Sequence, residues 1–147
     1  MLSRANDFNM RTKTIREFYK GKIRFTKDAR EGFSNMFRVV LPKLASPTLI
    51  GSISGIEQLM PQKLRKPMIH AGQHCVGKGV NVHKLLRTDI GPWLVGRQIL
   101  DYRVHEFIVG AMYAFGSIVL NLAAKHAKTK TINVEDVEFA VDQFWED

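Results

Sequence analysis

The sequence predicts an all-α protein whose helices pack around an apolar core. Apolar residues recur at positions i, i+3 and i+4 over residues 26–45 and again over 100–125, which places them on one face of an α-helix. The second half of the chain also has the order short helix, loop, long helix, loop, short helix. With 45% hydrophobic and 24% charged residues among 147, the composition favours a folded helical chain over a disordered one.

The first half of the chain predicts a short helix over 7–19, then a basic turn and a longer helix. Thr26 is a suitable N-cap for the longer helix, because a threonine hydroxyl accepts a hydrogen bond from the backbone of the first turn. Pro47 should end this helix, and a short third helix is expected over 55–60. The predicted buried face of the longer helix comprises Ala29, Phe33, Met36, Phe37, Val40, Leu41 and Leu44.

The middle of the chain is predicted to be a connector. Residues 61–81 hold two prolines and three glycines and show no long apolar period, and we place the connector itself at 67–80. Asn81 is then a suitable cap for a helix over 82–90, which the following Gly-Pro pair should stop. A loop that carries Arg97 leads into the long helix.

The long helix is predicted over 100–125, where the apolar spacing persists for about six turns. Within it, residues 107–124 carry no charged side chain. The last helix is predicted over 134–144. Asn133 is placed to cap it, and Asp136 stands at the third position of a near capping box.

The charge is strongly basic and unevenly distributed. The whole chain carries a net charge of +8 at pH 7. Residues 1–75 contain 14 Lys and Arg against 5 Asp and Glu, whereas residues 76–147 contain 8 against 9. An excess of this kind predicts a polyanionic partner, either nucleic acid or an anionic membrane. The single cysteine, Cys75, excludes an internal disulfide framework and fits a reducing compartment, and no signal peptide is recognised.

The second half of the chain resembles the core histones. Residues 121–141 are similar to the end of the central helix, the second loop and the last helix of histones three and four. The shared residues are His126, Ala127, Lys128, Thr131, Ile132, Asp136 and Ala140. Residues 82–87, VHKLLR, are similar to the first helix of histone two-A. These features combine several histones, so the resemblance indicates the family rather than a subtype.

The first half resembles histone two-B. Residues 27–45 are similar to its central helix, and residues 51–64 to a shortened second loop, last helix and extension. The whole chain therefore looks like a miniature of the fused two-B/two-A histone doublets of some giant DNA viruses. This implies two tandem histone folds (helix–loop–long helix–loop–helix) that pair in an internal handshake. The two-B-like fold would span 1–66, the connector 67–80 and the two-A-like fold 81–147.

The resemblance implies an architectural protein that packages double-stranded DNA with other core histones or histone doublets, in the chromatin of a nucleus, a viral factory or a virion. A handshake places the first loop of one fold beside the second loop of its partner, where basic side chains, backbone amides and helix N-termini meet phosphates. Binding should be sequence-tolerant and salt-dependent. The expected DNA-binding residues are Lys20, Lys22, Arg24, Lys27, Arg97, Lys128, Lys130 and Thr131, with Arg97 the candidate for minor-groove insertion. An acidic patch is expected from Glu138, Asp142, Glu146 and Asp147.

Three alternatives use the same residues differently. A histone-fold subunit of a transcription or kinetochore complex would keep the pairing but wrap little DNA. Residues 1–75 could instead form a basic helical extension before a single fold. The uncharged run at 107–124 is long enough for a membrane span, although the capped helix that follows it needs no membrane.

Enzymatic chemistry is not predicted, and no cofactor, metal or small-molecule substrate is expected. Residues 72–79 imitate a phosphate-binding loop, but Gly79 stands where a Ser or Thr must hold Mg²⁺. His70, His74 and Cys75 lack an evident fourth metal ligand. His126 is expected to be structural, and no nucleophile, base and orienting group occur at catalytic spacing.

Overall fold

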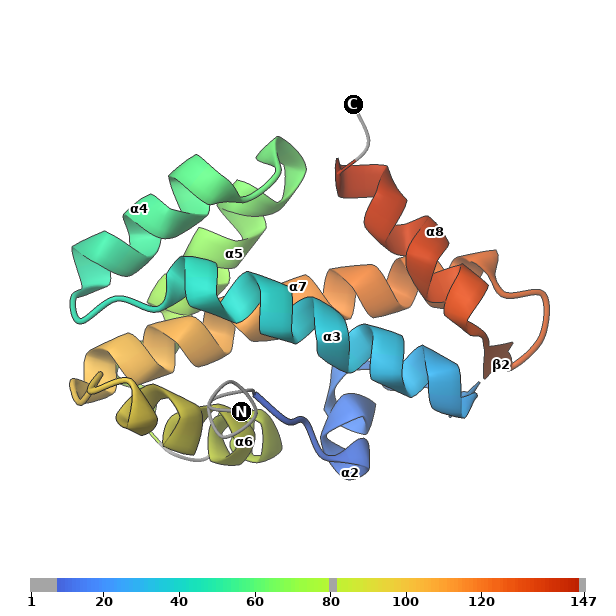
Figure 1. Cartoon of the computed structure of the whole chain (residues 1–147), viewed down its shortest axis with the longest axis horizontal. Helices are drawn as coiled ribbons and strands as arrows, with labels where there is room; N and C mark the ends of the chain where they lie inside the picture. The colour runs from blue at the N-terminus through green and yellow to red at the C-terminus, as the bar shows by residue number, and fades with distance from the viewer. Residues whose placement is uncertain (1–7, 80–81, 146–147) are drawn as a thin grey trace, which may run out of the picture.

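The structure, a computed structural model, describes residues 8–79 and 82–145 and is mostly helical, as Figure 1 shows. Helices account for 74% of it and strands for 3%, so the predicted all-α class is confirmed. In chain order the elements are α2 (Thr12–Ile15), the 3-10 helix η1 (Arg16–Phe18), β1 (Arg24–Phe25), α3 (Lys27–Leu44), α4 (Leu49–Leu59), α5 (Gln62–Cys75), α6 (Lys84–Gly96), α7 (Tyr102–His126), β2 (Thr131–Ile132) and α8 (Val134–Trp145).

Helix α7 runs through the middle of the molecule (Figure 1) and is buried along most of its length. Helix α3 crosses it, α5 packs closely against it, and α6 and α8 pack against it toward opposite ends of the molecule. Burial on several sides explains why residues 107–124 contain no charge, since an unpaired charge in such a place would be costly.

Several predicted helix ends are confirmed. The Thr26 hydroxyl accepts a hydrogen bond from the backbone N–H of Ala29 at 3.1 Å, and α3 continues through Pro42 to end before Pro47. At the start of α8, the Asp136 carboxylate accepts a hydrogen bond from the backbone N–H of Asn133 at 2.8 Å, which is one half of a capping box.

The prediction of a non-helical connector is wrong, because most of residues 67–80 are helical. Helix α5 covers Gln62–Cys75 and packs tightly against α7. A Cβ atom added at Gly110 of α7 would lie 2.5 Å from the carbonyl oxygen of Ala71. Another, added at Gly72 of α5, would lie 2.6 Å from the ring of Phe107. The two glycines therefore allow the two helices to approach closely.

Other predicted boundaries are also corrected. The first helix was expected over 7–19, but α2 and η1 together occupy only residues 12–18. Helix α4 begins at Leu49, six residues before the predicted start of the third helix. Helix α6 continues past Gly91 and Pro92 to Gly96, so Trp93 is helical rather than in a loop. The predicted cap, Asn81, lies outside the described residues.

Five phenylalanines join the two halves of the chain in the core. Phe37 of α3 has ring-centroid distances of 6.0 Å to Phe8, 5.5 Å to Phe18, 5.3 Å to Phe33 and 5.7 Å to Phe115 of α7. All five side chains are buried. Because the cluster contains residues from both ends of the sequence, neither half completes its core alone.

Candidate nucleic-acid interface

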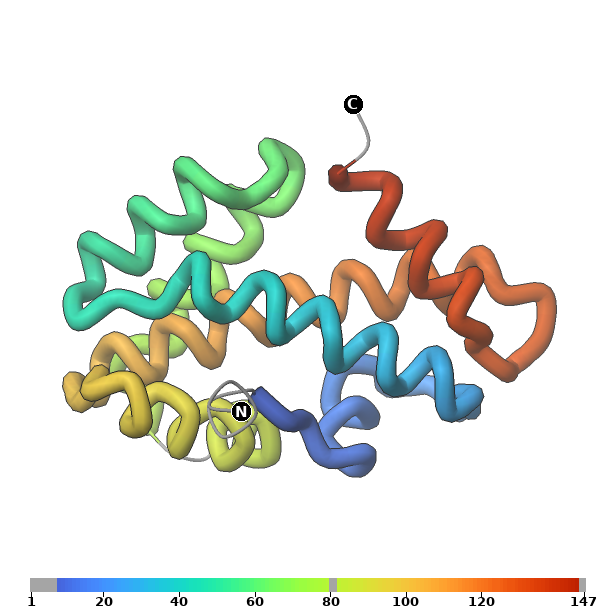
Figure 2. Tube along the Cα trace, viewed as in Figure 1, coloured from blue at the N-terminus to red at the C-terminus, as the bar shows by residue number. Residues whose placement is uncertain are grey.

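Two basic loops from opposite halves of the chain are joined by a short parallel strand pair. Arg24 of β1 is opposite Thr131 of β2, and Phe25 is opposite Ile132. The backbone N–H of Arg24 donates to the carbonyl oxygen of Lys130 at 2.8 Å. Figure 2 shows the two connecting segments at the right-hand end of the molecule, before α3 and after α7. The prediction that these loops lie side by side is confirmed, and we call this region the β1–β2 edge.

Most of the predicted DNA-binding residues belong to the β1–β2 edge. Lys22, Arg24 and Lys130 line a surface concavity of about 520 Å³. Arg16 of η1 lines the same concavity and was missed, although it is a basic residue immediately before the basic turn. The residues with exposed basic side chains in or beside the two loops are Arg16, Lys20, Lys22, Arg24, Lys27, Lys128 and Lys130.

Thr131 has a structural position at this edge. Its side chain is half-buried, and its backbone N–H donates to the hydroxyl of Thr129 at 3.1 Å. The neighbouring Ile132 is fully buried and anchors β2 to the core. These contacts hold Lys128 and Lys130 on an ordered loop, which reduces the conformational entropy that ligand binding would cost.

His126 and Asp136 fix the two ends of the second basic loop. The imidazole Nδ1 lies 2.8 Å from the Asp136 carboxylate, and the imidazole ring stacks on Phe139 with 4.0 Å between centroids. The pair connects the last residue of α7 to the first turn of α8 and therefore sets the path of β2 between them. This placement agrees with the structural role expected for His126.

Arg97 lies apart from the other predicted residues. It follows α6 and precedes α7, at the opposite end of α7 from β2. Its guanidinium carbon lies 4.0 Å above the ring of Trp93, a cation–π arrangement that holds the side chain in place. Any contact that Arg97 makes with DNA would belong to a second edge of the molecule.

The N-terminus of α6 is occupied by an acidic side chain from the first half. The two carboxylate oxygens of Glu17 accept hydrogen bonds from the backbone N–H groups of Leu85 and Leu86, at 2.9 and 3.0 Å. Asp89 of α6 accepts further hydrogen bonds from Thr14 and the backbone of Arg11. Helix N-termini were expected to meet phosphates, but at α6 these amides already have an anionic partner within the chain.

Glu17→Ala is expected to lower the free energy of unfolding by about 2 kcal/mol, because two first-turn amides lose a charged acceptor. Urea denaturation followed by circular dichroism measures the change. Glu57→Ala provides the control, since Glu57 is exposed on α4, and it should shift stability by less than about 0.5 kcal/mol. Equal effects of the two substitutions would show that the Glu17 cap contributes nothing specific.

The backbone amides of the segment that imitates a phosphate-binding loop also have a hydrogen-bond acceptor within the chain. The Glu106 carboxylate accepts hydrogen bonds from the backbone N–H groups of Gly77 and Gly79, at 2.8 and 3.2 Å. Burial, and then the nearby charge of Glu106, raise the pKa of the Cys75 thiol, which disfavours a reactive thiolate. The two glycine amides are therefore not arranged for phosphate binding, and the Cys75 thiol is not arranged for nucleophilic chemistry.

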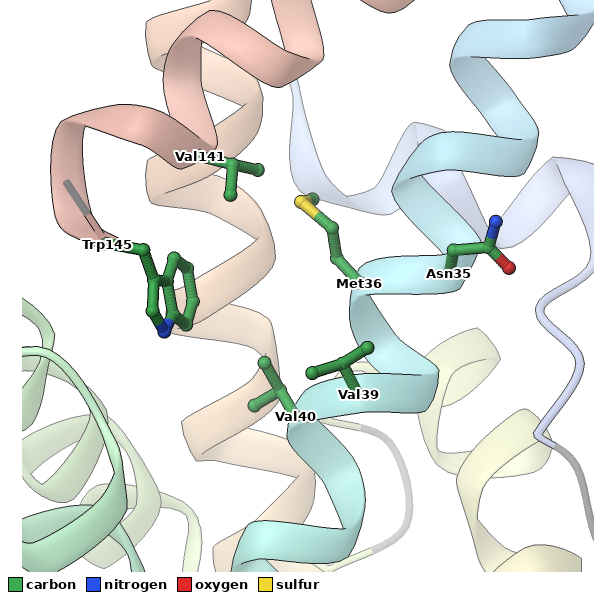
Figure 3. Close-up of a pocket in the computed structure, with 6 residues that line it drawn as sticks. All are labelled: Asn35, Met36, Val39, Val40, Val141 and Trp145. Carbon is green, nitrogen blue, oxygen red and sulfur yellow. The ribbon is translucent and has the colours of Figure 1, made fainter.

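Two further surface features accompany the β1–β2 edge. Of the predicted acidic patch, Glu138 and Asp142 are exposed on α8, while Glu146 and Asp147 lie outside the described residues. A groove of about 320 Å³ lies beside the contact of α3 with α8, and Figure 3 shows Met36, Val39 and Val40 on one side of it and Val141 and Trp145 on the other. Asn35 is the sixth lining residue, so the lining contains no titratable side chain.

The structure also bears on a metal site and on a membrane span. Among the residues that the structure describes, no three His, Cys, Asp or Glu side chains are grouped to hold a metal ion. Helix α7 is long and apolar enough to cross a membrane, but 61% of its most apolar window is buried inside the molecule. The core helix of a helical bundle has the same length and composition.

No protein-family model matches the chain. A search of curated proteins finds no similar sequence either. The sequence and geometry of the chain itself are therefore the basis for its proposed function.

Proposed function

We propose that the chain is an architectural DNA-packaging protein built from two tandem histone folds. The first fold would comprise α2, η1, β1, α3 and α4, and the second α6, α7, β2 and α8. Each unit has a short helix, a loop, a longer helix, a loop and a final helix, with α5 as an extension between them. DNA would lie along the molecule without sequence preference, and other histones or doublets would complete the particle.

The parallel pairing of β1 with β2 is the observation that carries this proposal. It joins the loop before the longer helix of one unit to the loop after the longer helix of the other, which is the arrangement that a handshake requires. The contacts of α3 with α7 and α8, and of α7 with α4, provide further support, because the longer helix of each unit then packs on the longer helix and last helix of its partner.

Electrostatics favours DNA as the partner of the β1–β2 edge. Seven exposed Lys and Arg side chains gather in and beside two adjacent loops, and no acidic side chain lines their shared concavity. Phosphates of the DNA backbone match such a surface, and their neutralisation releases counterions. Contacts of this kind carry no base code, so the proposal requires similar affinity for unrelated sequences.

Lys128→Glu/Lys130→Glu is expected to weaken DNA binding by at least about tenfold and to reduce the slope of log K against log salt by about 2. Fluorescence anisotropy with two duplexes of unrelated sequence, over a range of salt concentrations, measures both quantities. Unchanged affinity and slope would remove the β1–β2 edge from the DNA path.

Lys63→Glu/Lys66→Glu is the matched control. Both lysines are exposed on α5, so the total charge changes equally while the β1–β2 edge stays intact. The control should retain most of the affinity that the edge variant loses. Equal losses in the two variants would indicate that net charge alone governs binding, and would contradict a defined DNA-binding edge.

A further inference from the structure

The end of the molecule opposite the β1–β2 edge exposes large apolar side chains in the turn between α6 and α7. Leu100 is 66% exposed and Tyr102 is 71% exposed. Leu100 stands between the two helices, and Tyr102 is the first residue of α7. The Tyr102 ring lies 6.0 Å from the His105 ring between centroids and 5.9 Å from the Arg87 guanidinium carbon, whereas the exposed Leu100 side chain has no polar group to interact with solvent.

Burial and hydrogen bonds fix the backbone on both sides of Leu100. Ile99, immediately before it, is buried, and its backbone N–H donates to the carbonyl oxygen of Leu94 at 3.0 Å. The carbonyl oxygen of Ile99 lies 2.6 Å from Nε2 of the buried His105. Asp101, immediately after Leu100, caps α7 by accepting a hydrogen bond from the backbone N–H of Arg103. Leu100 therefore projects from a backbone that is fixed on both sides.

The charges around Leu100 favour an anionic partner. Arg97 and Arg103 are exposed on either side of it, three residues away in each direction. Asp101 is the acidic residue of the turn, and its carboxylate lies 3.3 Å from the Arg103 guanidinium. Side-chain and backbone hydrogen bonds from Arg103 lower the pKa of Asp101. This ion pair is exposed and contributes little to stability, so the Arg103 guanidinium can exchange it for a phosphate. An apolar tip between two arginines matches a DNA minor groove better than an apolar protein surface.

The distance between the two ends of the molecule fits one turn of DNA. Helix α7 separates the Arg97–Arg103 turn from the β1–β2 edge and has 25 residues. At about 1.5 Å per residue it spans roughly 37 Å, and a turn of B-DNA rises about 34–36 Å. For a duplex that lies parallel to α7, the same groove would therefore face the protein at both ends.

We propose that Leu100 is an apolar wedge that enters the minor groove, partly unstacks one base step and kinks the DNA, with Arg97 and Arg103 holding the phosphates on either side. This inference rests on the proposed DNA-binding function and adds a local deformation to it. Partial unstacking by an apolar side chain bends a duplex toward the major groove by about 20–90°. Flexible pyrimidine–purine steps would be preferred at this position, because they unstack most easily.

Leu100→Ala tests the wedge, with Leu59→Ala as its matched control. Leu59 is 54% exposed on α4 and is replaced in the same way. The probe is a duplex of about 30 base pairs, carrying 2-aminopurine at a TA step and a dye at each end. For the wild-type protein we expect 2-aminopurine fluorescence to rise on binding and the two dyes to approach. Leu100→Ala should lose at least about half of both signals while its affinity changes less than about tenfold, whereas Leu59→Ala should behave as wild type.

The outcomes separate the wedge from the proposed function. Salt-dependent binding by the wild type without a rise in 2-aminopurine fluorescence would overturn the wedge and leave the proposed DNA binding intact. Absence of DNA binding by the wild type would overturn both. If Leu100→Ala instead abolishes a self-association seen by analytical ultracentrifugation and leaves DNA bending unchanged, the tip is a protein interface and the wedge is wrong.

Discussion

Phe37→Ala is expected to lower the free energy of unfolding by about 3–5 kcal/mol, a large part of the roughly 5–15 kcal/mol of a typical domain. Phe37 is fully buried and contacts aromatic rings from α3, from the segments before it and from α7. Truncation leaves a cavity at the point where the halves meet, so both should lose stability together. Urea denaturation, followed by circular dichroism and tryptophan fluorescence, measures the loss.

Val39→Ala is the control for Phe37→Ala. Val39 lies two residues along the same helix but is 60% exposed, so its truncation should change stability by less than about 0.5 kcal/mol. Phe37→Leu keeps most of the volume and provides a folded intermediate case if the alanine variant does not fold. A loss below about 1 kcal/mol for Phe37→Ala, or separate transitions for the two halves, would contradict a shared core.

Gly110→Ala is expected to destabilise the protein by about 2 kcal/mol, even though alanine has the higher helix propensity. The added methyl group would lie 2.5 Å from the carbonyl oxygen of Ala71 and 2.8 Å from Sγ of Cys75, so α5 must move away from α7. Overpacking of this kind costs about 1–3 kcal/mol, more than the gain of up to about 1 kcal/mol from propensity. Thermal and urea denaturation measure the net effect.

Gly32→Ala reverses the expected sign. Gly32 is inside α3, and its added methyl group would meet Val134 at 3.6 Å, an ordinary contact distance. Helix propensity should therefore dominate and stabilise the protein by about 0.5–1 kcal/mol. If both glycine variants were stabilised, the close packing of α5 on α7 would be wrong.

The fold class and the long helices were predictable because their apolar spacing is regular. Helix ends were harder, since a Gly-Pro pair was interpreted as a stop at Gly91. Proline disfavours helical geometry at the residue before it through clashes with that residue's N–H and Cβ. Gly91 lacks the Cβ, but α3 and α5 also continue through Pro42 and Pro67, so packing outweighs the lost backbone hydrogen bond in all three helices.

Helix α5 was missed because its buried face does not look apolar in the sequence. Its buried positions are Leu64, Met68, Gly72 and Cys75, which follow helical spacing, but a glycine in the third place hides the period. Gly72 is buried because Phe107 covers it, a contact that depends on α7. Pattern recognition within one segment cannot supply such a partner.

The candidate interface was predictable only in part. The two basic loops are visible in the sequence, and the resemblance implied that they would meet, as β1 and β2 do. The cap that Glu17 provides to α6 was not predictable, because it joins residues about seventy positions apart through backbone amides. Backbone donors have no sequence signature, so such contacts emerge only in three dimensions.

The pairing of β1 with β2 also determines when the protein can fold during its synthesis. Strand β1 leaves the ribosome long before β2, and Phe18, Phe33 and Phe37 emerge well before Phe115. The nascent first half therefore has an uncovered apolar face while α7 is still being translated. Contacts between such distant segments form slowly and expose intermediates to aggregation. This chain therefore cannot complete its folding before β2 has been translated.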